Sequence, residues 1–416
     1  DKFAHENYEN VITYDFRHRK ELRSIFNGNL DVDSLIEKSF PYFPNDKFIP
    51  NKTILIFEEI GDCPLARTSL KSFALDKRYA VIGTGSLLGV LNYRRKEKIE
   101  VPTGYEKIIH MSSLDFEEFL WANGVDEKAI STLKEYIKQK KELPSALANF
   151  YKGMIERYVV IGGMPGSVKK FLKTNNFIKS REYLEGLIKD YRSDFGRFIN
   201  KDDEEEVDYS LQAKLNRVFD SIPSQLAREA DVSKFKYSEI KSGGRSKEFE
   251  EPFQWLERAG LVLRCFNLHA IEKPLEANAD SSYFKAFIAD IGLLMAMYPL
   301  TTSTSFLTDK LDSRKGAIYE NLAAIMLNKA GFPLYYFASG MEHLEIDFII
   351  ETKDGINLIE EKSTNGKMSA SRNVMEGKTP YKASKCYKVI RNNFGEGDFS
   401  HAGIMDHASS MKTPWV

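Results

Sequence analysis

Two short apolar segments that end in polar side chains place the strongest constraint on this chain. Residues 53–59, TILIFEE, run through four apolar residues into Glu58 and Glu59. Residues 79–89, YAVIGTGSLLG, form a second apolar segment that ends in hydroxyl and glycine groups. Near-continuous apolar runs of this length are typical of strands buried on both faces of a parallel sheet. Because helical patterns lie between the runs, the sequence predicts an α/β fold whose strands end at a common edge.

The polar ends of these strands suit phosphoryl transfer. In that reaction a carboxylate at a strand tip orients Mg²⁺ and its waters, and a second carboxylate positions or deprotonates the attacking water. The prediction gives the first role to Glu58 and the second to Glu59. Thr84 and Ser86, at the end of the neighbouring strand, would then read the γ-phosphate of ATP. The alternative interpretation of these glutamates is a strand that simply leaves the core.

Composition narrows the class of protein without selecting a function. The 416 residues suffice for about two to four domains. A net charge of -1 gives no bulk positive field for nucleic acid, so any such contact must be local. The three cysteines, Cys63, Cys265 and Cys386, are isolated, which favours a reducing cytoplasm over disulfides or zinc. The longest apolar stretch, 292–300, is far shorter than the roughly 20 residues that span a bilayer, so we expect a cytoplasmic protein without a membrane partner.

Many further segments occur in the order typical of one ATPase family. The chain resembles the bacterial and archaeal AAA-type ATPases that carry a C-terminal DUF4143 domain, and the resemblance covers nearly its whole length. The segments that carry it are 57–89 (FEEIGDC to GSLLG), 102–124 (PTGYEKII to LWANG), 158–172 (YVVIGGMPGSVKKFL), 191–198 (YRSDFGRF), 221–229 (SIPSQLARE), 284–294 (FKAFIADIGLL), 316–322 (GAIYENL) and 345–350 (EIDFII).

The resemblance implies a P-loop core that binds ATP and hydrolyses it with Mg²⁺. This chain departs from the family at Glu58, where the family usually has the shorter Asp, and a longer side chain alters the geometry around Mg²⁺. The family's phosphate-binding loop precedes the segment that corresponds to 11–16, so we expect that loop to lie ahead of Asp1. The EGKTP segment at 376–380 is predicted to be a surface turn, because Arg372 replaces the first glycine of the motif.

Pattern and resemblance together predict four regions. The first is a RecA/AAA-like parallel-sheet core at 1–125, and the second is a helical lid at 126–200 that contains GGMPG. A winged-helix-like module at 201–298 follows, and a restriction-endonuclease-like α/β domain at 299–416 closes the chain. The winged-helix module would be the site of contact with DNA or with a protein partner.

The last region contains a second group of carboxylates. The order Glu320, Asp347, Glu360, Lys362 resembles the PD-(D/E)xK nuclease fold. That resemblance implies metal ligation by Asp347 and Glu360, with Glu320 as a further ligand or as a partner of the ligands, and a catalytic role for Lys362. Because side chains alternate along a strand, two strands are expected to present Asp347, Glu360 and Lys362 together. The alternative is an inherited fold in which these polar groups pair with one another.

Three functions stay open on the sequence. The first is an ATPase whose nucleotide state is coupled to the winged-helix and nuclease-like regions. The second is a metal-dependent nucleic-acid hydrolase with a regulatory ATPase, and the third is a non-catalytic module that binds DNA or protein. Arg94 and Arg95 would reach the nucleotide of a neighbouring subunit if the protein forms a homo-oligomer.

Overall fold

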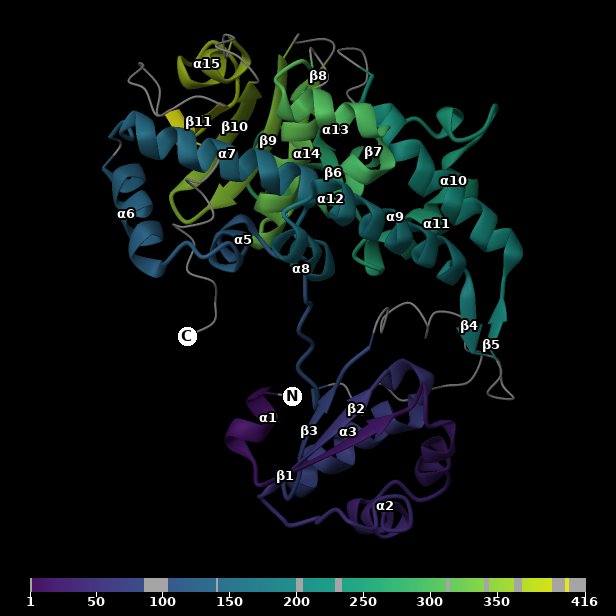
Figure 1. Ribbon diagram of the computed structural model, residues 1–416. Helices are drawn as coiled ribbons and strands as arrows, with labels where there is room; N and C mark the ends of the chain where they lie inside the picture. Colours follow the sequence, from purple (N-terminus) through teal and green to yellow (C-terminus); the bar gives the residue numbers. More distant parts are fainter. Residues whose placement is uncertain are drawn as a thin grey trace. The chain divides into compact units, whose positions relative to one another are not determined.

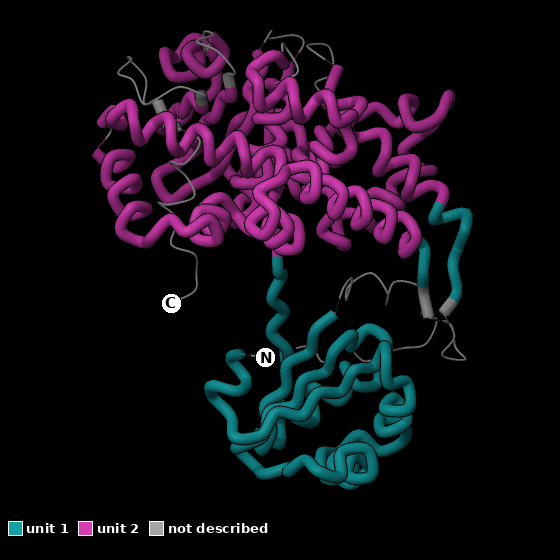
Figure 2. The backbone as a smooth tube through the Cα atoms, viewed as in Figure 1, with its two compact units in different colours: residues 1–111, 196–212 teal, residues 112–195, 213–416 magenta. Residues whose placement is uncertain are grey.

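The computed structural model describes residues 2–85, 104–139, 141–199, 205–228, 234–311, 315–339, 344–362, 369–390 and 401–403. The chain divides into two compact units, which Figure 2 shows in different colours. Unit 1 comprises residues 1–111 and 196–212, and unit 2 comprises residues 112–195 and 213–416. Within the described residues, the structure contains no helix whose length and apolar character would let it cross a membrane.

Unit 1 is built on the predicted parallel sheet. Its strands β1 (Asn10–Asp15), β2 (Thr53–Glu58) and β3 (Ala80–Gly83) lie in the order β1-β2-β3, with both pairs parallel (Figure 1). In this register Asp15 lies opposite Glu58, and Phe57 lies opposite Gly83. The carboxyl ends of all three strands therefore meet at one edge, and the α/β prediction is confirmed.

Helices and turns complete this unit. The helices are α1 (Lys2–Asn7), η1 (Lys20–Phe26), α2 (Val32–Ser39), η2 (Ile60–Asp62) and α3 (Pro64–Asp76), where η denotes a 3₁₀ helix. A two-stranded antiparallel ribbon of β4 (Arg197–Ile199) and β5 (Glu205–Val207) also belongs to unit 1.

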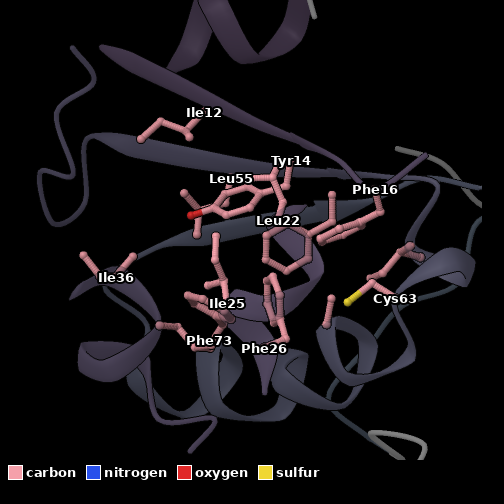
Figure 3. Packing of buried hydrophobic residues seen from close by; sticks show 14 of the residues in the cluster. Ile12, Tyr14, Phe16, Leu22, Ile25, Phe26, Ile36, Leu55, Cys63 and Phe73 are labelled. Atoms are coloured by element: carbon pink, nitrogen blue, oxygen red, sulfur yellow. The ribbon is translucent and has the colours of Figure 1, made fainter. Parts of the chain in front are cut away.

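The core of unit 1 explains why the apolar run in β2 does not alternate with polar residues. Leu55 and Phe57 pack on one face with the aromatic rings of Tyr14, Phe16 and Phe26 (Figure 3). On the other face Ile54 and Ile56 pack with Ala4 of α1. Because both faces of the strand are covered, every position from 53 to 57 must be buried, and each is.

Unit 2 begins with a run of helices. They are α5 (Phe116–Ala122), α6 (Glu127–Lys138), α7 (Ser145–Ile161), α8 (Pro165–Thr174) and α9 (Phe177–Asp194). Asp115 starts α5 with a capping box, in which its side chain accepts from the Glu118 N–H and Glu118 bonds back to the Asp115 N–H. The segment 126–200 is thus mostly helical, as its pattern indicates, whereas its assignment as a lid stays a prediction.

Helices α10 (Tyr209–Leu226) and α11 (Ser246–Arg258), with the short η3 (Tyr237–Glu239) between them, lead into the strands of unit 2. Among its described residues, unit 2 has a sheet of seven strands in the order β12-β11-β10-β9-β8-β6-β7. The strands are β6 (Val262–Leu268), β7 (Ala279–Ile288), β8 (Tyr335–Ser339), β9 (Leu344–Thr352), β10 (Gly355–Lys362), β11 (Lys385–Ile390) and β12 (His401–Gly403). The helices after β6 are η4 (Leu275–Asn278), α12 (Ile291–Met297), α13 (Leu300–Leu307), α14 (Lys315–Lys329) and α15 (Ser369–Met375).

The sheet joins two regions that the sequence analysis separated. Strands β6 and β7 come from the predicted winged-helix module, and β8 to β12 come from the predicted nuclease-like domain. They form one sheet because β6 pairs in parallel with β8 through Phe266 and Asn267. The order α10, η3, α11, β6 agrees with the expected order of elements, and the winged-helix assignment itself stays a prediction.

Candidate functional site

The carboxyl edge of the sheet in unit 1 brings three of the four predicted nucleotide-site residues together. Glu58 ends β2, and its carbonyl oxygen accepts a hydrogen bond from the Phe16 N–H just after β1, at 3.2 Å. The Thr84 N–H donates to the Phe57 carbonyl at 2.8 Å, and the Thr84 carbonyl accepts from the Ile60 N–H at 2.9 Å. These bonds tie Glu58, Glu59 and Thr84 to one edge. The fourth residue, Ser86, lies outside the described residues, as do Arg94 and Arg95.

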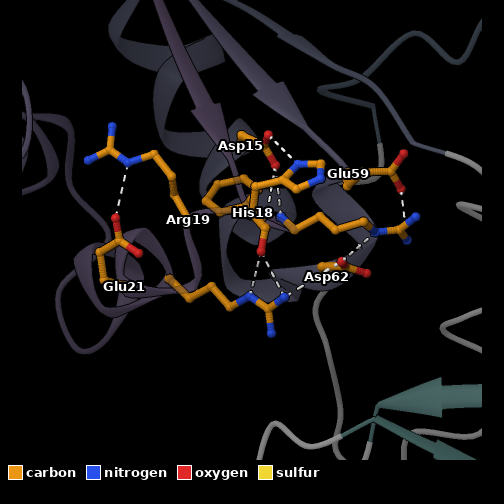
Figure 4. A network of polar contacts seen from close by, with 9 residues as sticks. Asp15, His18, Arg19, Glu21, Glu59 and Asp62 are labelled. Atoms are coloured by element: carbon orange, nitrogen blue, oxygen red, sulfur yellow. Dashed lines mark hydrogen bonds and ion pairs between the residues drawn. The ribbon is translucent and has the colours of Figure 1, made fainter.

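Glu59 occupies a turn that points its side chain out of the strand. Its backbone is left-handed, with φ 51° and ψ 49°, an uncommon conformation for a residue other than glycine. Its carboxylate forms an ion pair with Arg17, at 3.2 Å between Nη2 and Oε2 (Figure 4). Arg17 Nε also lies 3.3 Å from Asp62 Oδ2. Arg17 therefore connects the predicted general base to the short helix that follows β2.

Asp62 and Arg23 extend this connection into the core. Asp62 is buried, and its Oδ2 lies 3.6 Å from Arg23 Nη2. Arg23 also donates two hydrogen bonds to the Phe16 carbonyl, from Nε at 2.9 Å and from Nη2 at 2.7 Å. The resulting network links the ends of β1 and β2 and holds Glu59 in place. Sequence reasoning missed this network, although parallel topology places residues after β1 beside residues after β2.

Asp15 is a further carboxylate at this edge that the sequence analysis did not single out. Its oxygens accept from the backbone N–H groups of Arg17 and His18, at 3.1 and 2.9 Å, and from the His18 ring, at 2.7 Å. The backbone hydrogen bond from His18 and the His18 ring lower the pKa of Asp15. Among the described residues, none forms an ion pair or hydrogen bond with the Glu58 carboxylate, which leaves Glu58 as the acceptor at this edge that a cation would meet.

In unit 2 the predicted carboxylates are divided between the two faces of the sheet. Glu320 of α14 forms an ion pair with Lys285 of β7 at 2.8 Å, and Asp347 of β9 raises the pKa of both groups through its charge. Glu360 of β10 instead accepts from the Ser371 N–H of α15, at 2.9 Å. The side chain of Lys362 lies outside the described residues.

A bulge in β9 gives the reason for this division. Tyr335 lies opposite Ile349 and Phe337 lies opposite Ile346, so β9 has one more residue than β8 between the two pairings. Ile346 accordingly packs in the cluster that contains Val374 of α15, whereas Phe348 packs in the cluster that contains Ala324 of α14. The expected common face for Asp347 and Glu360 is therefore not what the structure shows. Within the described parts of the chain, no group of three or more His, Cys, Asp or Glu side chains is arranged to hold a metal ion.

The parallel sheet with carboxylates at its carboxyl edge defines unit 1 as an α/β core of the P-loop NTPase type. Comparison with protein families agrees, because residues 1–120 match an AAA domain. Residues 153–304 match a domain of unknown function (DUF8612), and residues 315–402 match a second domain of unknown function (DUF4143). The chain thus combines an AAA domain with a C-terminal DUF4143 domain, as the resemblance in its sequence predicts. Comparisons with curated proteins and with solved structures found no match.

The family matches also bear on the interpretation of the site. The AAA domain indicates an ATPase-type nucleotide-binding function. The DUF8612 match begins within α7 and ends within α13, so it spans part of the predicted lid, the whole predicted winged-helix module and the first residues of the predicted nuclease-like domain. Neither domain of unknown function supplies an activity for unit 2.

Proposed function

We propose that the protein binds ATP at the carboxyl edge of the β1-β2-β3 sheet and hydrolyses it with Mg²⁺. One observation carries the proposal: Glu58, Glu59 and Thr84 lie at the same edge of a parallel sheet within an AAA domain. Ligands of α/β proteins bind at this edge, where loops after adjacent strands diverge. The acidic groups there have the chemistry that a nucleotide with its metal requires.

Each residue has a distinct role in this proposal. Glu58 would hold Mg²⁺, because carboxylate oxygens are the hard donors that this ion prefers and because no described group occupies its carboxylate. Bound Mg²⁺ neutralises charge on the phosphate oxygens. Glu59 accepts a proton from the attacking water, and Arg17 fixes the direction of its carboxylate. The hydroxyls of Thr84 and Ser86 bond to the γ-phosphate.

The nucleotide state of unit 1 would act on unit 2 through the chain itself. The chain passes between the two units after residues 111, 195 and 212, so three connections join unit 1 to unit 2. One of these connections leads from α9 to the β4–β5 ribbon, and another lies within α10. A rearrangement of unit 1 on hydrolysis would therefore change the positions of the helices that precede the large sheet of unit 2.

Steady-state phosphate release tests the proposal. Glu59→Gln keeps the shape of the side chain and removes its basicity, so we expect ATP affinity to stay within about two-fold and turnover to fall by about 100-fold or more. Glu37→Gln on α2 is the matched control, because Glu37 is exposed and its loss should leave turnover unchanged. Full turnover by the Glu59→Gln protein would refute the assignment of the base.

A further inference from the structure

A buried lysine stands among the carboxylates of unit 2. The Lys285 side chain is only 11% exposed, and its Nζ donates to Glu320 Oε1 at 2.8 Å. Glu345 of β9 lies 3.7 Å from the same Nζ. The Tyr336 ring packs against the ammonium group, with its centroid 5.0 Å from Nζ. Lys285 lies on β7, outside the Glu, Asp, Glu-x-Lys order that the sequence analysis singled out.

The two carboxylates beside this lysine differ in exposure. The Glu320 side chain is 21% exposed, whereas the Glu345 side chain is 54% exposed. Lys285 is therefore the positive partner of one largely shielded carboxylate and lies within reach of a second, exposed one.

A carboxylate that is largely shielded from water requires a positive partner, because its charge is otherwise left without compensation. In a metal-dependent hydrolase that partner is a divalent ion, held by two or more carboxylates with room for water. Here a lysine side chain already fills the position beside Glu320, with its ammonium group 2.8 Å from the carboxylate. A divalent ion at the same carboxylates would lie next to an ammonium group, and the two positive charges would repel strongly in this buried environment.

We propose that the Lys285 ammonium group takes the place that a divalent metal ion bound to Glu320 would need. These residues of the folded protein do not bind Mg²⁺, and unit 2 does not cut nucleic acid by metal-dependent hydrolysis at these carboxylates. This inference concerns unit 2 and is independent of ATP hydrolysis in unit 1. The proposal also explains a contrast in unit 2. The order of its residues resembles the PD-(D/E)xK fold, yet the described residues contain no group of three or more His, Cys, Asp or Glu side chains that could hold a metal ion.

Titration of the whole protein with Mn²⁺ alone tests the inference, with the free ion measured by electron paramagnetic resonance. The first comparison is between the unsubstituted protein and Asp347→Asn. We expect both to bind the same number of Mn²⁺ ions, because Asp347 holds none. Loss of one bound ion in Asp347→Asn would overturn the proposal. Mn²⁺ bound elsewhere on the protein cancels in this difference.

The second comparison removes the lysine charge. Lys285→Met replaces the side chain with an apolar one of similar length, so we expect the variant to bind one additional Mn²⁺ ion. The double variant Lys285→Met with Asp347→Asn should lose that ion again. A folded Lys285→Met protein that gains no ion would contradict the proposal. If Lys285→Met does not fold, the Asp347→Asn comparison decides the question without it.

Discussion

The carboxylate of Asp290 accepts hydrogen bonds from both sides of a helix crossing in unit 2. Its Oδ2 accepts from the Gly163 N–H at 2.9 Å, and its Oδ1 accepts from the Leu293 N–H at 3.0 Å. One side chain thus caps α12 and secures the turn between α7 and α8. The GGMPG and ADIG segments, far apart in the sequence, meet at this point. The glycines serve a close approach of backbones: a Cβ on Gly292 would lie 2.6 Å from the Cα of Gly162.

A methyl group at Gly163 should disrupt this crossing. The Cβ of Gly163→Ala would lie 2.0 Å from the carbonyl oxygen of Leu114, and backbone cannot move aside as a side chain can. The Leu114 N–H also donates to the Gly163 carbonyl at 2.7 Å, so a shift of either segment breaks that bond. We expect the free energy of unfolding to fall by about 3 kcal/mol, measured by urea unfolding with circular dichroism.

Gly153→Ala is the matched control for this prediction. Gly153 lies inside α7, and a Cβ there would meet nothing within 4 Å. Alanine is the better helix former, so we expect stability to rise by about 0.5–1 kcal/mol. Equal losses in the two variants would show that the crossing tolerates a methyl group and would contradict the prediction.

The other end of α12 depends on Arg181 of α9. Its Nη1 donates to the Met295 carbonyl at 2.9 Å, and its Nη2 donates to the Ala296 carbonyl at 3.0 Å. These carbonyls have no partner within the helix, so Arg181→Met should leave them buried and unsatisfied. We expect a loss of about 2–3 kcal/mol in the free energy of unfolding, measured by urea titration.

Lys179→Met controls for the loss of a positive charge on the same helix. Lys179 pairs with Glu182 at 2.8 Å, and both side chains are more than half exposed. Such pairs contribute about 0.2–1 kcal/mol, so this variant should be close to the unsubstituted protein. A loss for Lys179→Met as large as that for Arg181→Met would mean that the charge, and not the capping, accounts for the effect.

The sheet edge of unit 1 could be predicted from the sequence because it depends on local patterns. The apolar run that ends at Glu58 fixes a strand buried on both faces, and a parallel sheet places such strand ends together. The positions of Arg17 and Arg23 could not be predicted in the same way. Their long side chains contact Asp62 across the segments that follow β1 and β2. Such a contact depends on how these segments pack together, and the periodic pattern of apolar residues in the sequence does not indicate it.

The carboxylates of unit 2 show a different limit. Alternation along a strand predicts that Asp347 and Glu360 lie on the same face of the sheet. The single extra residue in β9 changes the alternation there, so the two side chains lie on opposite faces. The partner of Glu320 was missed because Lys285 lies on β7, and strand order in a mixed sheet cannot be inferred from the strands alone. For the same reason the sequence did not indicate that β6 and β7 join the sheet of the DUF4143 region.

The attachment of α11 to β6 should depend on pH through Glu250. Burial alone would raise the pKa of Glu250, but its ion pair and hydrogen bond with Arg264, at 2.8 Å, outweigh burial and lower the pKa. A folded-state pKa below the unfolded value of 4.5 means that the pair stabilises the fold above about pH 4.5. This contribution is lost as the pH falls through the lowered folded-state pKa.

Glu250→Gln measures that dependence. We expect it to cost about 0.2–1 kcal/mol at pH 7, since Glu250 is partly exposed, and to cost progressively less as the pH falls below about 4.5. Urea unfolding of both proteins between pH 7 and pH 3.5 gives the difference. Glu272→Gln, at an exposed position, controls for the loss of a negative charge. A Glu250→Gln effect that stays constant over this range would count against the ion pair as its source.

Asp62 should stabilise unit 1 more than a surface carboxylate does, because it is buried between Arg17 and Arg23. Asp62→Asn removes the charge that both guanidinium groups face, so we expect a loss of about 2 kcal/mol. Asp33→Asn is the control, since Asp33 pairs with Arg78 at 2.7 Å while its side chain is 79% exposed, and it should cost under about 1 kcal/mol. Hydrogen exchange of peptides from β1 and β2 localises the effect to unit 1. Equal exchange in the two variants would refute a structural role for Asp62, whereas faster exchange confined to Asp62→Asn would show that this network holds the strand ends at which Glu58 and Glu59 lie.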